Sequence, residues 1–107
     1  MAQPRAQLRA RANHDVEQAL EHLLNEAGPE VALAFIDALE HGLRQVVRNP
    51  ALGSLRFAYE LGIPELRALR LRKFPHVVFY VHRGEVVDVW RVLHTSRDLP
   101  ARLGNEP

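Results

Sequence analysis

The most prominent candidates for a functional site in this sequence are arginines that alternate with leucines and could bind an anion. In the run Leu66–Lys73, Arg70 and Arg72 alternate with Leu69 and Leu71, as they would in a strand with one buried face. An arginine pairs with a carboxylate or a phosphate through two parallel hydrogen bonds. Two interpretations follow: a solvated face paired with acids on neighbouring strands, or an anion-binding surface for nucleic acid or for an acidic protein.

A second group of polar residues closes the last apolar run of the chain. Arg91 and His94 are followed closely by Arg97 and Asp98. A histidine in this place is a candidate general acid or base, because imidazole exchanges protons near neutral pH. The alternative is structural: His94 would hydrogen-bond the backbone to hold the tail, and Arg97 would pair with Asp98. Residue chemistry alone favours the structural interpretation.

Several kinds of site have no support in the sequence. No cysteine is present, which excludes disulfides, thiolate nucleophiles and cysteine-bound zinc. Neither a glycine-rich phosphate loop nor a GxSxG nucleophile motif occurs. No closed metal-ligand spacing is found among the six histidines, His14, His22, His41, His76, His82 and His94. We therefore expect neither a metal nor a cofactor.

Two amphipathic helices in the first half must help to position these groups. Asn13 is a suitable N-cap, Gly28 ends the first helix, and Pro29 opens the second, which stops at Asn49-Pro50. The first apolar stripe contains Val16, Leu20, Leu23, Leu24 and Ala27. The second contains Ala32, Phe35, Ile36, Leu39, Leu43, Val46 and Val47. The short joint predicts an antiparallel helical hairpin whose apolar faces need a cover.

A small antiparallel sheet in the second half is predicted to provide that cover. It follows an irregular segment, Ala51–Pro64, and its last two strands meet at a tight Arg83-Gly84 turn. The three strands are predicted at Leu66–Lys73, Phe74–His82 and Glu85–His94. Gln3–Ala10 offers a fourth strand before the helices. We expect an α+β fold with the helical hairpin packed on this sheet, in one domain over residues 1–107 with residues 104–107 frayed.

Charge is divided unevenly along the chain. Residues 1–50 hold five basic and seven acidic residues, a net charge of −2, whereas residues 51–107 hold nine and six, a net charge of +3. Lys73 is the only lysine among the fourteen basic residues. No stretch approaches the roughly 20 apolar residues that would span a bilayer, and Met1–Ala12 has no apolar signal region. We expect a cytoplasmic protein without membrane contact.

The order of these elements and several short motifs resemble the RelE/ParE superfamily of toxins from type II toxin-antitoxin systems, and its ParE branch most of all. The helical part of the resemblance is generic and ends at Asn49-Pro50 and Gly53. The more specific part lies in the strands and in the tail. It consists of Phe79-Tyr80, Gly84, Arg91-Val92-Leu93-His94 and Arg97-Asp98, and Leu69-Arg70 and Leu99 match as well.

The resemblance implies a cognate, ParD-like antitoxin whose C-terminal segment covers the helices and the sheet and silences the toxin. We assign this contact to the apolar helix faces, the basic strand and one sheet tyrosine. The candidate antitoxin-binding residues are Leu20, Leu24, Phe35, Leu39, Arg70, Arg72 and Tyr80.

The activity that the resemblance implies is inhibition of DNA gyrase through protein contact, with no catalytic residue and no direct specific binding of nucleic acid. The candidate target-binding residues are Arg91, His94, Arg97, Asp98 and Leu99. RelE-like members instead cut messenger RNA in the ribosome, which here would use His94 as acid or base and Arg70, Arg72 and Arg91 to stabilise charge. However, the several lysines and the C-terminal tyrosine frequent in those nucleases are missing. A further alternative is a non-toxic binding module with the same fold.

Overall fold

The computed structural model describes residues 4–96 of the chain. Its elements are, in order, β1 (Arg5–Leu8), α1 (Ala10–Ala27), α2 (Pro29–Arg48), α3 (Arg56–Leu61), β2 (Arg67–Arg70), β3 (His76–Arg83) and β4 (Val86–His94). The expectations for Arg97, Asp98 and Leu99, and for a frayed end at 104–107, lie outside the described residues.

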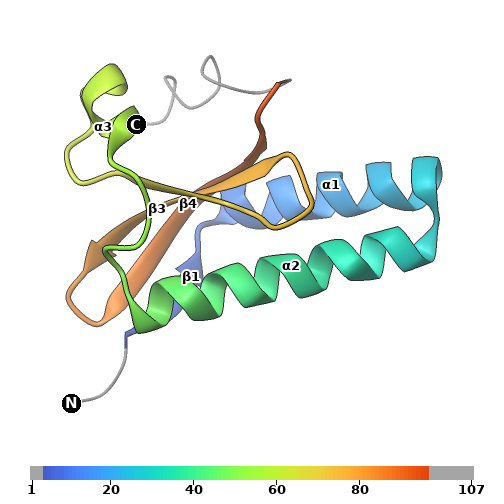
Figure 1. Ribbon diagram of the computed structural model, residues 1–107, viewed down its shortest axis with the longest axis horizontal. Coiled ribbons are helices and arrows are strands. Elements are labelled where there is room, and N and C mark those ends of the chain that lie inside the picture. Colours follow the sequence, from blue (N-terminus) through green and yellow to red (C-terminus); the bar gives the residue numbers. More distant parts are fainter. Residues whose placement is uncertain (1–3, 97–107) are drawn as a thin grey trace.

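The four strands form one mixed sheet in the order β1-β4-β3-β2. Strands β2, β3 and β4 pair antiparallel in sequence, which confirms the three consecutive strands expected from the C-terminal half. Strand β1 lies parallel to β4 at the sheet edge, and the long connection that a parallel pair requires contains the helical hairpin, α3, β2 and β3. The predicted α+β fold is therefore confirmed, including the fourth strand (Figure 1).

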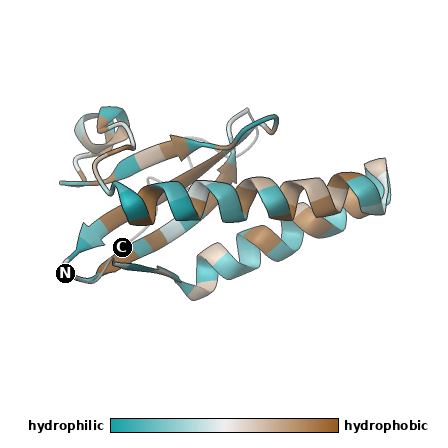
Figure 2. Ribbon diagram, turned by 60° about the horizontal axis from the view of Figure 1, so that its bottom comes forward, coloured by the Kyte–Doolittle hydropathy of each residue, from teal (hydrophilic) through white to brown (hydrophobic). Residues whose placement is uncertain are grey.

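Helices α1 and α2 cover one face of the sheet with the apolar stripes that the sequence predicts. Phe35, Leu39 and Val46 of α2 pack with Val78 and other inward side chains of β3 and β4 in a single core. In Figure 2 the central strands β3 and β4 are largely brown, whereas the helices alternate between teal and brown, as expected for helices with one buried face. Burial of these stripes against the sheet is what stabilises two helices that would be marginal alone.

The opposite face of the sheet carries a second core beneath α3. Ala58 of α3 packs there with Leu66 and with Phe79 of β3. The predicted irregular segment Ala51–Pro64 was thus wrong at its centre, since Arg56–Leu61 is helical. Six residues make less than two turns, so this helix has little intrinsic stability and depends on packing against the sheet, which local periodicity does not reveal.

Some predicted boundaries also need correction. Helix α1 begins at Ala10, three residues before the expected cap Asn13, whose side chain instead reaches back to the Leu8 carbonyl at 3.5 Å. Strand β2 ends at Arg70, so the expected strand to Lys73 was too long. The β3–β4 turn is at Gly84 and Glu85, one residue later than predicted, and a φ of 57° at Gly84 explains the glycine there.

The helical joint is as predicted. Gly28 adopts a φ of 92°, and its N–H is shared between the carbonyls of Leu23 and Leu24, while Pro29 starts α2. Figure 1 shows the closed end of this hairpin projecting past the strands. Within residues 4–96 no helix is both long and apolar enough to cross a membrane.

Candidate interaction surfaces

Arg91 lies inside the protein at an irregularity of β4. The register shifts between Phe79 and Tyr80 of β3, which face Arg91 and Val89, so Trp90 is an extra residue in β4. The Arg91 side chain, 2% exposed, donates from Nε and Nη2 to both carboxylate oxygens of Asp15 on α1, at 2.7 and 2.8 Å. This buried bidentate pair ties α1 to β4.

Asp15 also accepts a hydrogen bond from the backbone N–H of Val92 at 3.0 Å. The sequence interpretation did not identify Asp15, although one signal for it exists. Asp15 lies three residues after Ala12 and four before Ala19, which is the spacing of the core-facing positions of α1, and both alanines are buried. An acid at such a position needs a buried partner, and Arg91 is that partner.

His94 ends β4 within a group of rings on the helix side of the sheet. Its ring centroid lies 5.2 Å from that of the buried His76, which in turn lies 4.9 Å from Phe35 of α2. The backbone N–H of Ser96 donates to Nδ1 of His94 at 3.2 Å. This bond supports the structural interpretation of His94, in which the imidazole holds the backbone that follows β4.

The structure separates Arg70 from Arg72. Arg70 is exposed at the end of β2 and points to the outer face of the sheet, since Leu69 and Leu71 on either side approach Gly42 of α2. Arg72 follows the end of the strand, and its Nη1 lies 3.4 Å from Nε2 of His41 on α2. The expectation that both arginines share one strand face was therefore wrong, because the strand stops between them.

Tyr80 anchors the loop between α2 and α3 from within the core. Its hydroxyl donates to the carbonyl of Pro50 and accepts from the N–H of Gly53, each at 2.8 Å. A Cβ on Gly53 would lie 2.7 Å from this hydroxyl, so only glycine fits. Burial raises the pKa of Tyr80 above its ordinary value of 10.0, although the bond from Gly53 and the charge of Arg67 lower it.

The apolar candidates for antitoxin binding differ widely in exposure. Phe35, Leu39 and Tyr80 belong to the core and present little or no surface. Leu20 is half-buried, and Leu24 is 52% exposed. Leu33, which the sequence interpretation did not single out, is 61% exposed about one turn beyond the joint. The accessible apolar surface of the hairpin therefore lies near its closed end.

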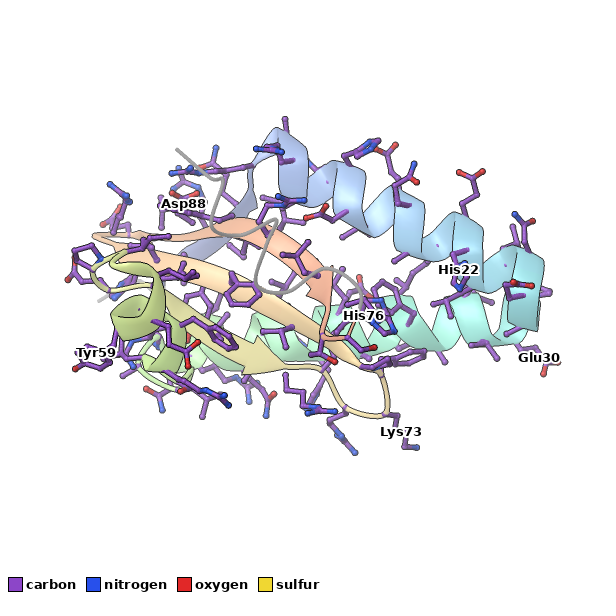
Figure 3. The ribbon with its side chains drawn as sticks, turned by 90° about the horizontal axis from the view of Figure 1, so that it is seen from above. His22, Glu30, Tyr59, Lys73, His76 and Asp88 are labelled. Atoms are coloured by element: carbon purple, nitrogen blue, oxygen red, sulfur yellow. The ribbon has the colours of Figure 1, made fainter. Side chains whose placement is uncertain are left out.

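Two hollows flank α3 on the outer side of the sheet. One, of about 710 Å³, is lined by Leu55, Tyr59, Glu65 and Arg67 among others, and Tyr59 stands 83% exposed at its edge (Figure 3). The other, of about 570 Å³, contains Arg70. In the described part of the chain, no three histidine or acidic side chains come close enough together to hold a metal ion.

A family model described as the ParE toxin of type II toxin-antitoxin systems, parDE, matches residues 6–99. The chain belongs to the ParE toxin family. This match covers nearly the whole chain, and it identifies the protein as a toxin of a type II toxin-antitoxin system, as the sequence motifs had indicated. Such a toxin is paired with an antitoxin partner.

A solved structure from the chromosomal ParDE toxin-antitoxin system of P. aeruginosa has the same fold. The two chains superpose with a TM-score of 0.73 at 18% sequence identity, over 88% of this chain and 98% of the other. Among curated protein sequences, none matches this chain significantly. At this sequence identity the superposition shows the ParE fold, and the match to the family model identifies the class of toxin.

In this ParE-family chain, the four residues that a nuclease would need do not converge. Arg91 is enclosed with Asp15, and His94 lies in the ring group beside His76. Arg70 opens to the outer face of the sheet, whereas Arg72 turns toward α2. The residues found from the sequence are therefore spread over the core and two surfaces, and do not form a single polar site.

Proposed function

We propose that this ParE-family toxin inhibits DNA gyrase by direct protein contact and that a ParD-like antitoxin neutralises it. Membership of the ParE family is the observation that carries the proposal. The dispersal of Arg70, Arg72, Arg91 and His94 supports a mechanism without catalysis, because phosphoryl chemistry needs its acid, base and cations within reach of one phosphate. Its place of action is the cytoplasm, where gyrase works.

For the target contact, we retain the region at the end of β4. The buried Arg91 acts indirectly in this proposal, because its pair with Asp15 fixes the strand that leads to Ser96. His94 contributes in the same way through its bond from Ser96. Arg97, Asp98 and Leu99 remain the proposed direct contacts.

For the antitoxin contact, we propose the closed end of the helical hairpin. Leu24 and Leu33 are more than half exposed there, with Leu20 partly accessible beside Leu24 on α1. Leu24 and Leu33 lie within a few residues of the joint, and large exposed apolar side chains gathered at one end of a small protein are typical of a partner surface. Phe35 and Leu39 lie in the core and Tyr80 anchors the loop after α2, so in this proposal none of the three touches the antitoxin directly.

The test is a supercoiling assay with purified toxin from which antitoxin has been removed. We expect loss of supercoiling, accumulation of gyrase-cleaved DNA, and recovery of supercoiling when antitoxin is added. Unchanged supercoiling at a large excess of toxin would refute gyrase as the target. Growth arrest in cells without antitoxin separates a toxin from a non-toxic module with this fold.

A second measurement separates this mechanism from messenger RNA cleavage. His94→Ala removes the only histidine at the end of β4, so an RNase of the proposed kind would lose translation arrest. We expect no translation arrest in a purified ribosomal system with either the original toxin or the variant. Cleavage of messenger RNA that disappears in His94→Ala would favour the nuclease.

A further inference from the structure

The two layers of the molecule carry opposite charge. Residues 10–48, which form α1 and α2, hold seven acidic and three basic residues, a net charge of −4. The other described residues, 4–9 and 49–96, hold nine basic and four acidic residues, a net charge of +5. The buried pair of Asp15 and Arg91 removes one charge from each side. An acidic partner is therefore attracted to the sheet side and repelled from the helical side.

On the sheet side, a groove of about 570 Å³ lies between α3 and the ends of the strands. We call it the outer groove; its lining includes Arg56, Phe57, Glu60, Arg70, Val77 and Thr95. Val77 and the neighbouring Ala68 give it an apolar floor, and the two arginines supply its positive charge. Helix α3 forms one wall, and it faces away from α1 and α2 because the sheet lies between them (Figure 1).

Arg70 is the charge in this groove that the fold leaves uncompensated. Within residues 4–96, no carboxylate lies within ion-pair distance of its guanidinium. Arg56 is less available, because its Nε lies 3.4 Å from Glu60, but both side chains are largely exposed and such a pair is weak. Two guanidinium groups over an apolar floor suit a ligand that has both carboxylates and apolar side chains.

We propose that the outer groove binds an extended acidic segment of the toxin's protein target. The carboxylates of the segment pair with Arg70 and Arg56, and its apolar side chains lie on the floor formed by Val77 and Ala68. This inference rests on the proposed function, since it assumes a target that is a protein. It gives that function a second contact surface, separate from the closed end of the helical hairpin where we place the antitoxin.

Two features favour a protein segment over a nucleic acid. The ring of Phe57 meets Phe79 edge to face at 5.3 Å and has the Arg56 guanidinium 5.5 Å from its centroid, so little of it is open for a base to stack on. The formal net charge of +1 gives little of the general attraction to phosphates that nucleic-acid binding proteins use.

The test replaces the uncompensated charge and compares it with a matched change on the other layer. Arg70→Glu is made in the full-length toxin, with Arg70→Lys beside it and Arg44→Glu, an exposed position of α2, as the control. Gyrase affinity is measured by surface plasmon resonance, and growth arrest is measured in cells without antitoxin. We expect Arg70→Glu to weaken gyrase binding by about tenfold or more and to relieve growth arrest, since reversing a contact charge turns attraction into repulsion.

We expect Arg70→Lys to keep most of the affinity, and Arg44→Glu to bind gyrase within about twofold of the original protein. The circular dichroism spectrum and the thermal denaturation midpoint of Arg70→Glu should match those of the original toxin, which shows that the variant is folded. Equal gyrase affinity of the Arg70→Glu variant and the original toxin would overturn the proposal. So would binding of a short single-stranded RNA that is lost in Arg70→Glu, because the groove would then hold nucleic acid.

Failure of the gyrase proposal gives a different pattern. The original toxin would then bind no gyrase yet still arrest growth, and the growth assay alone would test whether the outer groove contacts the target. Relief of growth arrest by Arg70→Glu but not by Arg44→Glu would support an acidic target other than gyrase. Full growth arrest by Arg70→Glu would overturn the outer groove as a target surface.

Discussion

Asp15 and Arg91 are the residues whose interaction most directly joins the helical layer to the sheet. Each has lost nearly all contact with water, and the pair is held by two hydrogen bonds between the side chains and a third from the backbone of Val92. Removing one member of a buried ion pair leaves the other charge without its counter-charge, which costs far more than the pair contributes when intact. The pair therefore specifies how α1 sits on β4.

Asp15→Ala should lower the free energy of unfolding by about 3–5 kcal/mol, because the buried Arg91 guanidinium loses its carboxylate. Urea denaturation followed by circular dichroism measures the loss. Glu17→Ala, at an exposed position of the same helix, serves as control and should stay within about 0.5 kcal/mol of the original protein.

Replacing both members of the pair, in Asp15→Leu with Arg91→Met, should recover most of the lost stability. Apolar side chains of similar size remove both buried charges together. If Asp15→Ala and Glu17→Ala had the same denaturation midpoint, the pair would not be what holds α1 to β4.

Tyr80→Phe should destabilise the protein by about 1–3 kcal/mol, since it leaves the Gly53 N–H and the Pro50 carbonyl without their partner. Thermal denaturation measures this loss. Tyr59→Phe is the matched control, because Tyr59 is 83% exposed on α3. A loss in Tyr59→Phe as large as that in Tyr80→Phe would contradict the role given to the buried hydroxyl.

Tyr80 also predicts how stability changes at alkaline pH. Burial raises its pKa above 10.0, so above that pH the unfolded chain gives up the phenolic proton while the folded chain keeps it. The unfolded state then binds fewer protons, and stability falls as the pH rises from about 10 through the folded pKa. Tyr80→Phe should show a smaller fall than the original protein; an equal fall in both would show that other groups cause it.

At the scale of elements, α3 and the irregularity in β4 do most to shape the two faces of the sheet. Helix α3 forms one wall of the outer groove and covers Phe79. The extra residue in β4 lets Val89 and Val92, three positions apart, both face the core beneath the helices. Strict alternation along the strand would have placed one of them on the outer face.

The helical hairpin carries the prediction for antitoxin binding. Leu24→Asp should weaken antitoxin binding by about 10- to 100-fold, because it places a charge in the proposed apolar contact. The stability of the free toxin should change little, since Leu24 is already more than half exposed. Isothermal titration calorimetry measures the affinity, with Gln18→Asp, at an exposed position of α1, as control. Equal antitoxin affinities for both variants would show that the antitoxin does not bind at the closed end of the hairpin.

At the scale of the whole molecule, the separation of charge between the layers predicts how binding responds to salt. An acidic target approaches the sheet side through long-range attraction, which salt screens. Raising the salt concentration from about 50 to about 500 mM should slow association with gyrase by tenfold or more. Stopped-flow measurements would show it, and the apolar antitoxin contact should respond less. An association rate that does not depend on salt would contradict the electrostatic part of the outer-groove proposal.

The β2–β3 turn carries two further basic residues. Figure 3 shows Lys73 at the β2–β3 turn, pointing away from the body of the protein, next to Arg72 in sequence. Its φ of 65° places it in the left-handed region, which a side chain rarely adopts. The turn lies beside α2, because Arg72 and Lys73 line a hollow together with Asp37 and His41 of that helix, so these two charges lie apart from the outer groove.

Local patterns were enough to predict most elements and the family. The 3.6-residue stripes, the Gly28-Pro29 joint and the β-branched strand runs are produced by each segment burying one face, so they can be read without knowing the neighbours. Helix α3 was not predicted, because its stability comes from packing on the sheet and not from a local pattern. The end of β2 was placed too late in the sequence, because leucine and arginine continue to alternate beyond Arg70, where the strand has ended.

The roles of the polar residues depended on tertiary structure. The sequence by itself determined which arginines and histidines are present, their order in the chain and the charge of each half. Only the fold decided that Arg91 pairs with Asp15 across 76 positions, that Arg70 and Arg72 face different sides, and that the halves become two charged layers. The reason is physical, because the residues that bury a side chain or pair with its charge come from segments distant in sequence. In addition, a single extra residue in β4 reverses the side of the sheet that the following residues of the strand face.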